Sequence, residues 1–389
     1  MNTRILPETE LQAPSPSALS SVPVWIEVNL EAIRQNIQQI KQFIGPRVKL
    51  LGVIKANAYG HGLLPIGWTL AQAGVDFLGV ASVLEAVKLR GQGINGKILV
   101  LGQLLPEEAP LVIENRLIQA AGDRESIAAL SAAASRAGTR AEIHLKVDTG
   151  MSRYGVWWEQ ARALAEEISR LPNIRVAGIL THLSMAGQNT DAVTEQLQRF
   201  SSVVSALEKD RFPVGLKHAA NSVSLLKFPG SHWDLVRSGL LLYGCSPLKD
   251  SKGVFPLRPA LSLKSRIRFL KTIPQGRGVS YGGTYQASRL TKVATIPVGY
   301  AHGYPRALSN RSSVLVRGLR AQVIGKITME DLMLDVTDIP QVRVGDEVVL
   351  IGRQGSDMIS AEELARHARS IPYEILAGLS ANIPRRYLG

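Results

Sequence analysis

The sequence predicts an α/β fold: a (β/α)8 barrel of the TIM type, followed by a mainly-β domain. From Trp25 onward, short apolar runs of strand type alternate with segments of helical period. Eight such runs lie between residues 48 and 238, the number that a (β/α)8 barrel needs. Beyond Pro259 the pattern changes to β-branched runs separated by glycine and proline, which is typical of a β domain. A doubly wound open sheet is the alternative fold for the first part.

The 389 residues are enough for more than one domain, and we distinguish three regions. Residues 1–22 contain charged residues and prolines but no continuous apolar stretch, so we expect a disordered tail and not a signal peptide. We expect the barrel over residues 23–258 and the mainly-β domain over residues 259–389. No run reaches the ~20 apolar residues of a membrane helix. A single cysteine, Cys245, forms no internal disulfide, so we expect a cytoplasmic protein.

The first helix is expected over residues 30–44, because five apolar side chains recur there at helical spacing. Asn29 is expected to cap this helix, and Gly45-Pro46 to end it. The eight strands of the barrel are expected at 48–54, 77–81, 97–101, 118–121, 142–147, 175–181, 215–219 and 234–238. In the second domain we expect strands at 293–298, 313–316 and 347–351, and a helix over 360–370. Ser360 and Glu363 have the spacing of a capping box at the start of that helix.

Composition and motifs exclude several classes of function. The formal net charge of +13 favours anionic ligands but does not choose among phosphates, carboxylates and nucleic acid. Residues 91–96 match the glycine pattern of dinucleotide-binding proteins, but they follow a helix and precede a strand, so we expect only a turn. The seven histidines contain no HExxH pattern, and no structural metal is expected. Without a Walker loop or a basic stripe with interleaved aromatic residues, nucleic-acid binding is not expected.

The most informative stretch is Val53-Ile-Lys-Ala-Asn-Ala-Tyr-Gly-His-Gly62. Its lysine, Lys55, follows the first barrel strand, at the end where barrels of this type place catalytic groups. A desolvated lysine is both a nucleophile and a base, so Lys55 is a candidate for a Schiff base with an aldehyde cofactor. From its position alone, a solvated lysine at the rim of the barrel is the more frequent outcome.

This stretch resembles the cofactor attachment signature of the alanine racemase family. Further motifs of that family follow in the family's order: Asp148-Thr-Gly-Met-Ser-Arg153, Thr181-His182, Ala220-Asn-Ser222, Val236-Arg-Ser-Gly239, Val279-Ser-Tyr-Gly-Gly-Thr-Tyr285, Gly299-Tyr-Ala301 and Pro372-Tyr-Glu374. The resemblance extends from Trp25 to the C-terminus. It implies a barrel that binds pyridoxal 5'-phosphate, and a homodimer with composite active sites. The implied reaction is the interconversion of L- and D-alanine, which supplies D-alanine for peptidoglycan.

The resemblance also implies roles for single residues. Lys55 would carry the cofactor and move a proton on one face of the substrate, and Tyr281, supplied by the partner subunit, would serve the opposite face. A racemase needs two such bases, because one base that returns its own proton regenerates the starting enantiomer. Arg153 and the backbone of Met329 would bind the substrate carboxylate. Taken without the resemblance, Tyr281 reads as a turn residue beside two glycines.

Nine residues match the family's cofactor contacts: Lys55, Tyr59, His182, Asn221, Ser222, Arg237, Gly239, Leu240 and Tyr373. Those around the phosphate would supply hydroxyl and backbone N–H donors, which a dianion needs. Arg237 would face the pyridine nitrogen and keep it unprotonated, because a guanidinium only donates. His182 would link Arg237 with Tyr281, or it is an ordinary core histidine. Ser222 has a second interpretation, as the N-cap of a helix over 223–226.

The sequence departs from the family pattern in one region. Gly187 and His302 stand where the family has aspartate, and Lys326 and Glu330 replace arginine and aspartate. These positions belong to the family's substrate corridor and its surroundings, so a racemase of broader specificity, or a serine racemase, is the main alternative. Lys146 aligns with a lysine that carries a carbamate in some relatives, and we hypothesise the same modification here. A decarboxylase of the same architecture and a non-catalytic anion-binding protein are the remaining alternatives.

Overall fold

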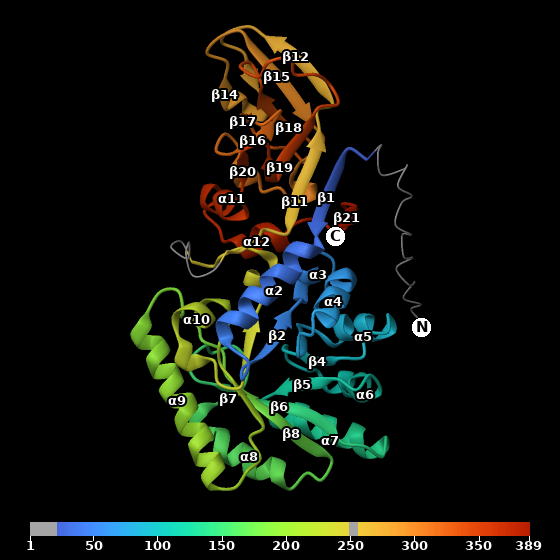
Figure 1. Cartoon of the computed structure of the whole chain (residues 1–389), viewed down its shortest axis with the longest axis vertical. Coiled ribbons are helices and arrows are strands. Elements are labelled where there is room, and N and C mark those ends of the chain that lie inside the picture. The colour runs from blue at the N-terminus through green and yellow to red at the C-terminus, as the bar shows by residue number, and fades with distance from the viewer. Residues whose placement is uncertain (1–21, 249–255) are drawn as a thin grey trace. The chain divides into compact units, whose positions relative to one another are not determined.

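The computed structural model describes residues 22–248 and 256–389, so nearly all of the expected N-terminal tail lies outside the described residues. The chain forms two compact units, which we call the barrel unit and the β unit (Figure 1). Of the described residues, the barrel unit contains 29–248, 256–260, 371–377 and 387–389. The β unit contains 22–28, 261–370 and 378–386. The two units therefore interleave along the sequence, in contrast to the single boundary that we expected near Pro259.

Eight parallel strands form the barrel, so this prediction is confirmed and the open doubly wound sheet is wrong. The strands are β2 (Lys49–Val53), β3 (Phe77–Val80), β4 (Lys97–Val100), β5 (Ile118–Ala121), β6 (Ala141–Asp148), β8 (Ile174–Leu180), β9 (Leu216–His218) and β10 (Leu235–Ser238). They pair in the order β10-β2-β3-β4-β5-β6-β8-β9. Between β9 and β10 single hydrogen bonds take the place of a ladder: the N–H of Asp234 donates to the carbonyl of Lys217 at 3.0 Å. Burial on both faces explains why these strands read as continuous apolar runs.

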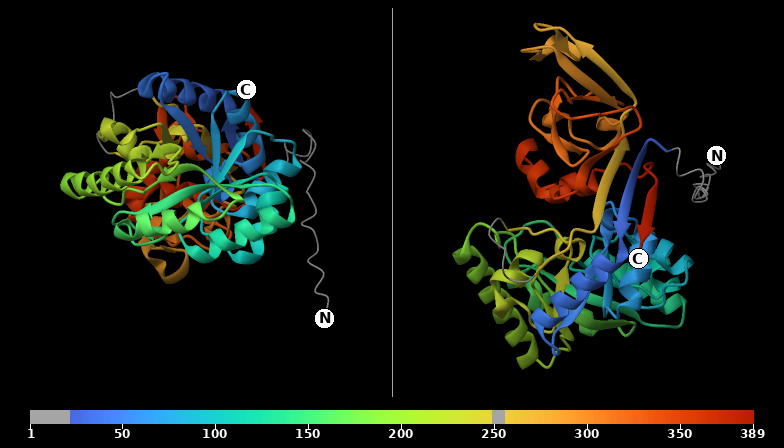
Figure 2. Two further views of the ribbon diagram at one scale, coloured as in Figure 1. Left: turned by 90° about the horizontal axis from the view of Figure 1, so that it is seen from below. Right: turned by 45° about the horizontal axis from the view of Figure 1, so that its top comes forward.

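Helices surround these strands, as the left view of Figure 2 shows. The helices of the barrel unit are α2 (Leu30–Ile44), α3 (Lys55–Tyr59), α4 (Leu63–Gln72), α5 (Val83–Gly91), α6 (Ala109–Glu114), α7 (Arg124–Arg136), α8 (Ala161–Ser169), α9 (Thr190–Lys209), α10 (Ser222–Lys227) and α12 (Pro372–Ala377). The expected first helix is confirmed: the side chain of Asn29 accepts the N–H of Ala32 at 2.8 Å, and Gly45 follows the last residue. The segment from Gly91 to Gly96 joins α5 to β4 as a turn, also as expected.

A ten-stranded sheet forms the β unit. Its strands are β1 (Val24–Asn29), β11 (Leu261–Arg266), β12 (Phe269–Ile273), β15 (Thr291–Ile296), β16 (Ser313–Val316), β17 (Leu319–Ile324), β18 (Leu332–Asp335), β19 (Glu347–Gln354), β20 (Asp357–Ile359) and β21 (Arg385–Leu388). A small hairpin, β13 (Gly278–Val279) and β14 (Tyr285–Gln286), carries the loop with Tyr281. Helix α11 (Ala361–Ala368) begins as expected, because the hydroxyl of Ser360 accepts the N–H of Glu363 at 3.1 Å.

Strand β1 differs from our expectation, which placed residues from 23 onward in the barrel. It pairs antiparallel with β11, so that Val24 lies opposite Ser265. The N–H of Ile26 also donates to the carbonyl of Pro384 at 2.9 Å. The backbone groups of β1 are thus satisfied by the β unit. None of the helices that the structure describes is long and apolar enough to cross a membrane.

Candidate active site

Lys55 stands two residues after the end of β2, at the carboxyl end of the barrel strands, where we expected it. Burial of its ammonium group and the charge of Arg153 lower the pKa of Lys55, while the charge of Glu85 opposes this shift. Glu85 also holds the backbone on either side: one carboxylate oxygen accepts the N–H of Ala56 at 2.7 Å and the other accepts the N–H of Ala81 at 2.8 Å. Sequence reasoning missed Glu85, because nothing in its own stretch of helix distinguishes it from a solvated glutamate.

The four residues after Lys55 adopt the left-handed helical conformation. The φ angles from Ala56 to Tyr59 lie at 52° or 53°, a region that costs roughly 1–2 kcal/mol per residue for side chains other than glycine. Local hydrogen bonds hold this turn: the carbonyl of Asn57 accepts the N–H of Gly62 at 2.9 Å, and its side chain accepts the N–H of Leu63 at 2.8 Å. Such a run of unusual dihedral angles at one place indicates a functional constraint.

Hydroxyl groups and backbone amides gather at the ends of β9 and β10. The N–H of Gly239 donates to the hydroxyl of Ser222 at 2.9 Å. The Tyr59 hydroxyl lies so close to Gly239 that a Cβ there would be only 2.5 Å away. The rings of Tyr59 and Tyr373 have their centroids 5.9 Å apart, and burial raises the pKa of both, to about 12 for Tyr373. Both phenols are therefore protonated donors, as the binding of a phosphate requires.

The N-cap of helix α10 is not Ser222, which we considered for it, but its neighbour. Asn221, and not Ser222, caps helix α10: its side-chain oxygen accepts the N–H groups of Val223 and Ser224 at 3.0 and 3.1 Å. The N-cap interpretation of Ser222 is therefore wrong, because the helix begins at Ser222 and its hydroxyl turns toward Gly239. Leu240 is fully buried at the start of a short 3₁₀ turn.

Arg237 lies inside the barrel with its guanidinium surrounded by acceptors. It donates to the carbonyls of Thr181 and Ala219 at 2.8 and 2.9 Å, and it lies 2.9 Å from Nδ1 of His218 and 3.2 Å from Nδ1 of His182. No carboxylate in the described part of the chain forms an ion pair with it. Burial lowers the pKa of Arg237 to about 9, yet the carbonyl oxygens favour the charged form. The expected contact between His182 and Arg237 is therefore present.

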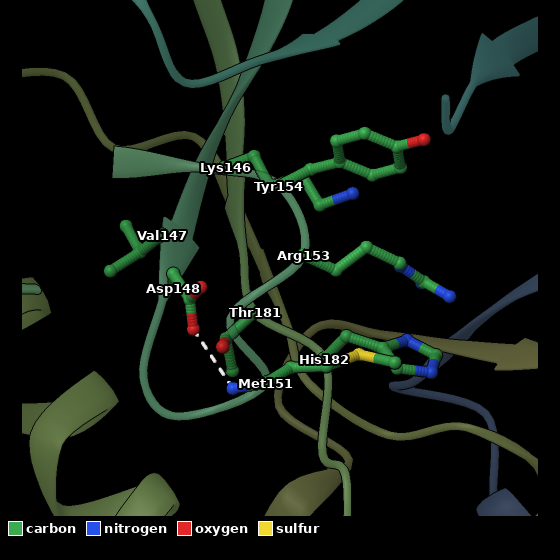
Figure 3. Close-up of a pocket in the computed structure, with 8 residues that line it drawn as sticks. All are labelled: Lys146, Val147, Asp148, Met151, Arg153, Tyr154, Thr181 and His182. Atoms are coloured by element: carbon green, nitrogen blue, oxygen red, sulfur yellow. Dashed lines mark hydrogen bonds between the residues drawn. The ribbon is translucent and has the colours of Figure 1, made fainter. Parts of the chain in front are cut away.

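A cationic pocket lies beside these groups, lined by Lys146, Val147, Asp148, Met151, Arg153, Tyr154, Thr181 and His182. Figure 3 shows the side chains of Lys146, Arg153 and His182 pointing to the same side. Nζ of Lys146 donates to the carbonyl of Leu101 at 3.2 Å and lies 4.9 Å from the centre of the Tyr154 ring. Burial, followed by the charges of Arg153, Arg237 and Lys55, lowers the pKa of Lys146 to about 8. This concentration of positive charge favours an anionic ligand.

Tyr281, by contrast, is a residue of the β unit, and 73% of its surface is exposed. It follows Ser280, whose φ of 61° is rare for a residue other than glycine, and the Ser280 hydroxyl donates to the carbonyl of Lys326 at 2.6 Å. The next glycine, Gly282, has a φ of 74°, and Nζ of Lys326 would lie 3.3 Å from a Cβ there. The loops of Tyr281 and Lys326 are thus held together within the β unit.

Met329 is also exposed and belongs to the same group of loops. Its carbonyl accepts the N–H of Ala301 at 3.0 Å, and the carbonyl of Thr328 accepts the N–H of Tyr300 at 3.1 Å. Among the departures from the family pattern, Nδ1 of His302 lies 3.8 Å from a carboxylate oxygen of Glu330.

The residues of the barrel unit fit a phosphorylated aldehyde cofactor. Lys55 can form a Schiff base because its pKa is lowered. Hydroxyl donors converge near a glycine that permits close approach, and an anion would be attracted by the surrounding cations. No group of three metal-ligating side chains occurs among residues 22–248 and 256–389.

Comparison with known proteins identifies the same family over both units. Residues 28–247 match the N-terminal domain of alanine racemases, and residues 260–387 match their C-terminal domain. The chain is 45% identical to the alanine racemase of Symbiobacterium thermophilum over 368 residues, which cover 94% of this chain and 97% of the relative. It is 43% identical to that of Halothermothrix orenii over 366 residues, with coverage of 94% and 97%.

Solved structures agree with this. The alanine racemase from D-cycloserine producing Streptomyces lavendulae has a TM-score of 0.90 at 34% identity, covering 95% of this chain and 97% of that one. The enzyme from Bacillus anthracis with bound L-Ala-P has a TM-score of 0.88 at 33% identity, covering 94% and 95%. Fold and matches define an isomerase that uses pyridoxal 5'-phosphate. Within that class, the chain belongs to the alanine racemase family.

Proposed function

We propose that the chain interconverts L- and D-alanine with two opposed bases, Lys55 and Tyr281. The observation that carries the proposal is the environment of Lys55. This amine has a lowered pKa, stands after a barrel strand, and lies among cations and among hydroxyl and N–H groups that can bind a phosphate. When bound there, pyridoxal 5'-phosphate supplies an electron-withdrawing ring that acidifies the α-hydrogen of an amino acid.

In this proposal each cofactor-contacting group of the barrel has one task. Lys55 holds the cofactor and then exchanges the proton on one face of the substrate. Tyr59, Ser222, Tyr373 and the N–H groups of Gly239 and Leu240 hold the phosphate. The tyrosines donate as neutral phenols, a form that burial favours further by raising their pKa. Arg237 faces the ring nitrogen as a fixed donor, which keeps that nitrogen unprotonated.

Substrate recognition would come from Arg153 and the backbone of Met329, which both bind the carboxylate. Arg153 can bind a carboxylate through two parallel N–H donors. Asp148 fixes the start of the loop that carries it, since one carboxylate oxygen accepts the N–H groups of Gly150 and Met151 at 2.8 and 2.9 Å.

We further propose a homodimer in which each active site takes Tyr281 from the partner subunit. The exposure of Tyr281, Tyr300 and Met329 in one group of loops supports this, because exposed large apolar side chains that lie together mark an interaction surface. In a C2 dimer every contact occurs twice, so two equivalent composite sites would result. We place the enzyme in the cytoplasm, where it would supply D-alanine for peptidoglycan.

A racemase that also accepts serine is the second candidate. Gly187 has no side chain, and a Cβ there would have only the Val223 side chain within 4 Å, at 3.9 Å. The resemblance places Gly187 in the surroundings of the substrate corridor, and a small pocket rejects an added hydroxyl weakly. The ratio of kcat/KM for alanine and for serine separates the two candidates.

The first test is the absorbance spectrum of the purified protein before and after borohydride, followed by peptide mapping. A visible band that borohydride removes, with the reduced adduct on Lys55, is the expected result. The Lys55→Arg variant is the matched control, because it keeps the charge but cannot form the Schiff base. No band after addition of pyridoxal phosphate, or an adduct on another lysine, would contradict the proposal.

A further inference from the structure

Arg237 is the end of a chain of three buried side chains that leads into the barrel. Its guanidinium lies 2.9 Å from Nδ1 of His218, and Nε2 of His218 lies 2.8 Å from Nδ1 of His144. Both histidines are fully buried, and Arg237 is nearly so. The two imidazole rings meet edge to face, with their centroids 5.0 Å apart at 71°. The proposed reaction gives no task to His144.

Donor and acceptor chemistry fixes where the protons of this chain lie. A guanidinium only donates, so in the arrangement of this structure Nδ1 of His218 accepts from Arg237. A neutral His218 then has its proton on Nε2, and this N–H donates to Nδ1 of His144. His144 in turn carries its own proton on Nε2.

Protonation of either ring to an imidazolium is opposed by everything that surrounds them. Burial and the charge of Arg237 lower the pKa of both histidines, to about 3 for His144, and Lys97 adds to the shift of His144. Nζ of Lys97 lies 5.2 Å from the centre of the Phe77 ring, and that ring packs at 6.1 Å from His144. The chain therefore has two neutral imidazoles and one cation, Arg237.

The far end of the chain has an unusual feature. Nε2 of His144 is buried and has no hydrogen-bond partner among the described residues. A buried donor without an acceptor destabilises the fold, and an aliphatic residue on β6 would avoid that cost. The benefit of a histidine at this position must then come from its other ring nitrogen, the one that faces His218.

We propose that His144 is a positioning residue for Arg237. Its Nδ1 accepts the Nε2 proton of His218, which keeps Nδ1 of His218 as the acceptor that orients the guanidinium. Without this acceptor the Nε2 proton of His218 would be buried and unpaired, which removes part of the preference for this tautomer. The proton could then move to Nδ1, where it would face the N–H groups of Arg237 and displace them. The statement about the tautomer stands alone, and only its effect on the reaction rests on the proposed function.

Three substitutions separate this role from simple packing. In His144→Asn the amide oxygen takes the place of Nδ1, so the acceptor is kept. In His144→Leu the acceptor is lost, and in His144→Gln the amide lies nearer to the place of Nε2. All three change the volume of the core, so a merely structural role predicts similar behaviour for them.

The direct test is nitrogen-15 NMR of histidine-labelled protein without cofactor, in which the two ring nitrogens report the tautomer. We expect His218 with its proton on Nε2 in the wild type and in His144→Asn. In His144→Leu or, if that variant does not fold, in His144→Gln, we expect the population of the Nδ1 tautomer to rise. A proton on Nδ1 in the wild type, or an unchanged tautomer in the variant without the acceptor, would overturn the proposal.

The second readout uses the protein with bound pyridoxal phosphate. We expect the ratio of side reactions, measured as loss of the cofactor band during turnover, to racemisation to rise about tenfold or more in His144→Leu, since one oriented hydrogen bond is lost. His144→Asn should stay close to the wild type. Equal changes in both variants would overturn the positioning role. A wild type that racemises nothing would refute the proposed function, yet it would leave the tautomer result intact.

Discussion

The carboxylate of Glu85 accepts the backbone N–H of Ala56 at 2.7 Å, directly beside Lys55. Its second oxygen binds the N–H of Ala81, so a single side chain on α5 fixes the backbone after β2 and after β3. Glu85 therefore acts twice on Lys55. It holds the left-handed turn that follows the lysine, and its charge raises a pKa that burial and Arg153 lower.

The substitution Glu85→Gln should weaken both the hold on the turn and the charge near Lys55 while the rest of the fold is unchanged. An amide nitrogen would face one of the two N–H groups, so we expect a loss of about 1–3 kcal/mol in the free energy of unfolding. The pKa of Lys55 should fall further, because the opposing negative charge is removed. Urea unfolding and the pH dependence of cofactor attachment measure the two effects. Glu107→Gln, at an exposed position, is the control and should stay within about 0.5 kcal/mol.

The close approach of Tyr59 to Gly239 leads to a second prediction. The substitution Gly239→Ala would place a Cβ 2.5 Å from the Tyr59 hydroxyl, so the tyrosine must move. We expect the Kd for pyridoxal phosphate to rise about tenfold or more, as for the loss of one charge-assisted hydrogen bond. Gly91→Ala is the matched control, since a Cβ there meets nothing within 4 Å. A titration that gives equal Kd values for the two variants would contradict this role of Gly239.

Much of the barrel could be predicted because its signals are local. Each strand is a short apolar run, and the cap at Asn29 and the stop at Gly45 lie within a few residues of the helix they bound. Strand β1 could not be placed in this way. Its pairing with β11 joins residues more than two hundred positions apart, and no local pattern carries that information.

The active site likewise has features that the local sequence predicts and features that it does not. Lys55 was found by its motif, whereas Glu85 and the left-handed turn were not, because their importance depends on which groups the fold brings together. Ser222 was assigned a possible capping role that belongs to Asn221, since two adjacent polar residues before a helix look alike in sequence.

The buried histidines predict a loss of stability in acid. The pKa of His144 in the folded chain is about 3, against 6.5 for an unperturbed histidine. Between these values the unfolded chain binds a proton that the folded chain does not, so stability falls as the pH drops below about 6.5. Each such histidine adds about 1.4 kcal/mol per pH unit to this slope. Urea unfolding at several pH values should give a shallower slope for His144→Asn, and identical slopes would contradict the assignment.

We predict a carbamate on Lys146. Carbon dioxide bonds to the neutral amine, which releases a proton, and the pKa of about 8 supplies that form near neutral pH. The carbamate would place a negative charge among Lys55, Arg153 and Arg237, so it should be stabilised. With carbon-13 bicarbonate, a carbamate NMR signal should grow as the pH rises and be absent in Lys146→Arg. An unmodified amine in electron density at this position would refute the prediction.

Composite sites can be tested by mixing two inactive variants. Lys55→Ala lacks the residue of the barrel unit and Tyr281→Phe that of the β unit. If each site draws on both subunits, a mixed dimer has one site without either residue and one complete site. Random exchange of subunits makes half of the dimers mixed, so activity should return to about a quarter of the wild-type value. Sites contained within single chains would give no recovery at any mixing ratio, because every site would still lack one base.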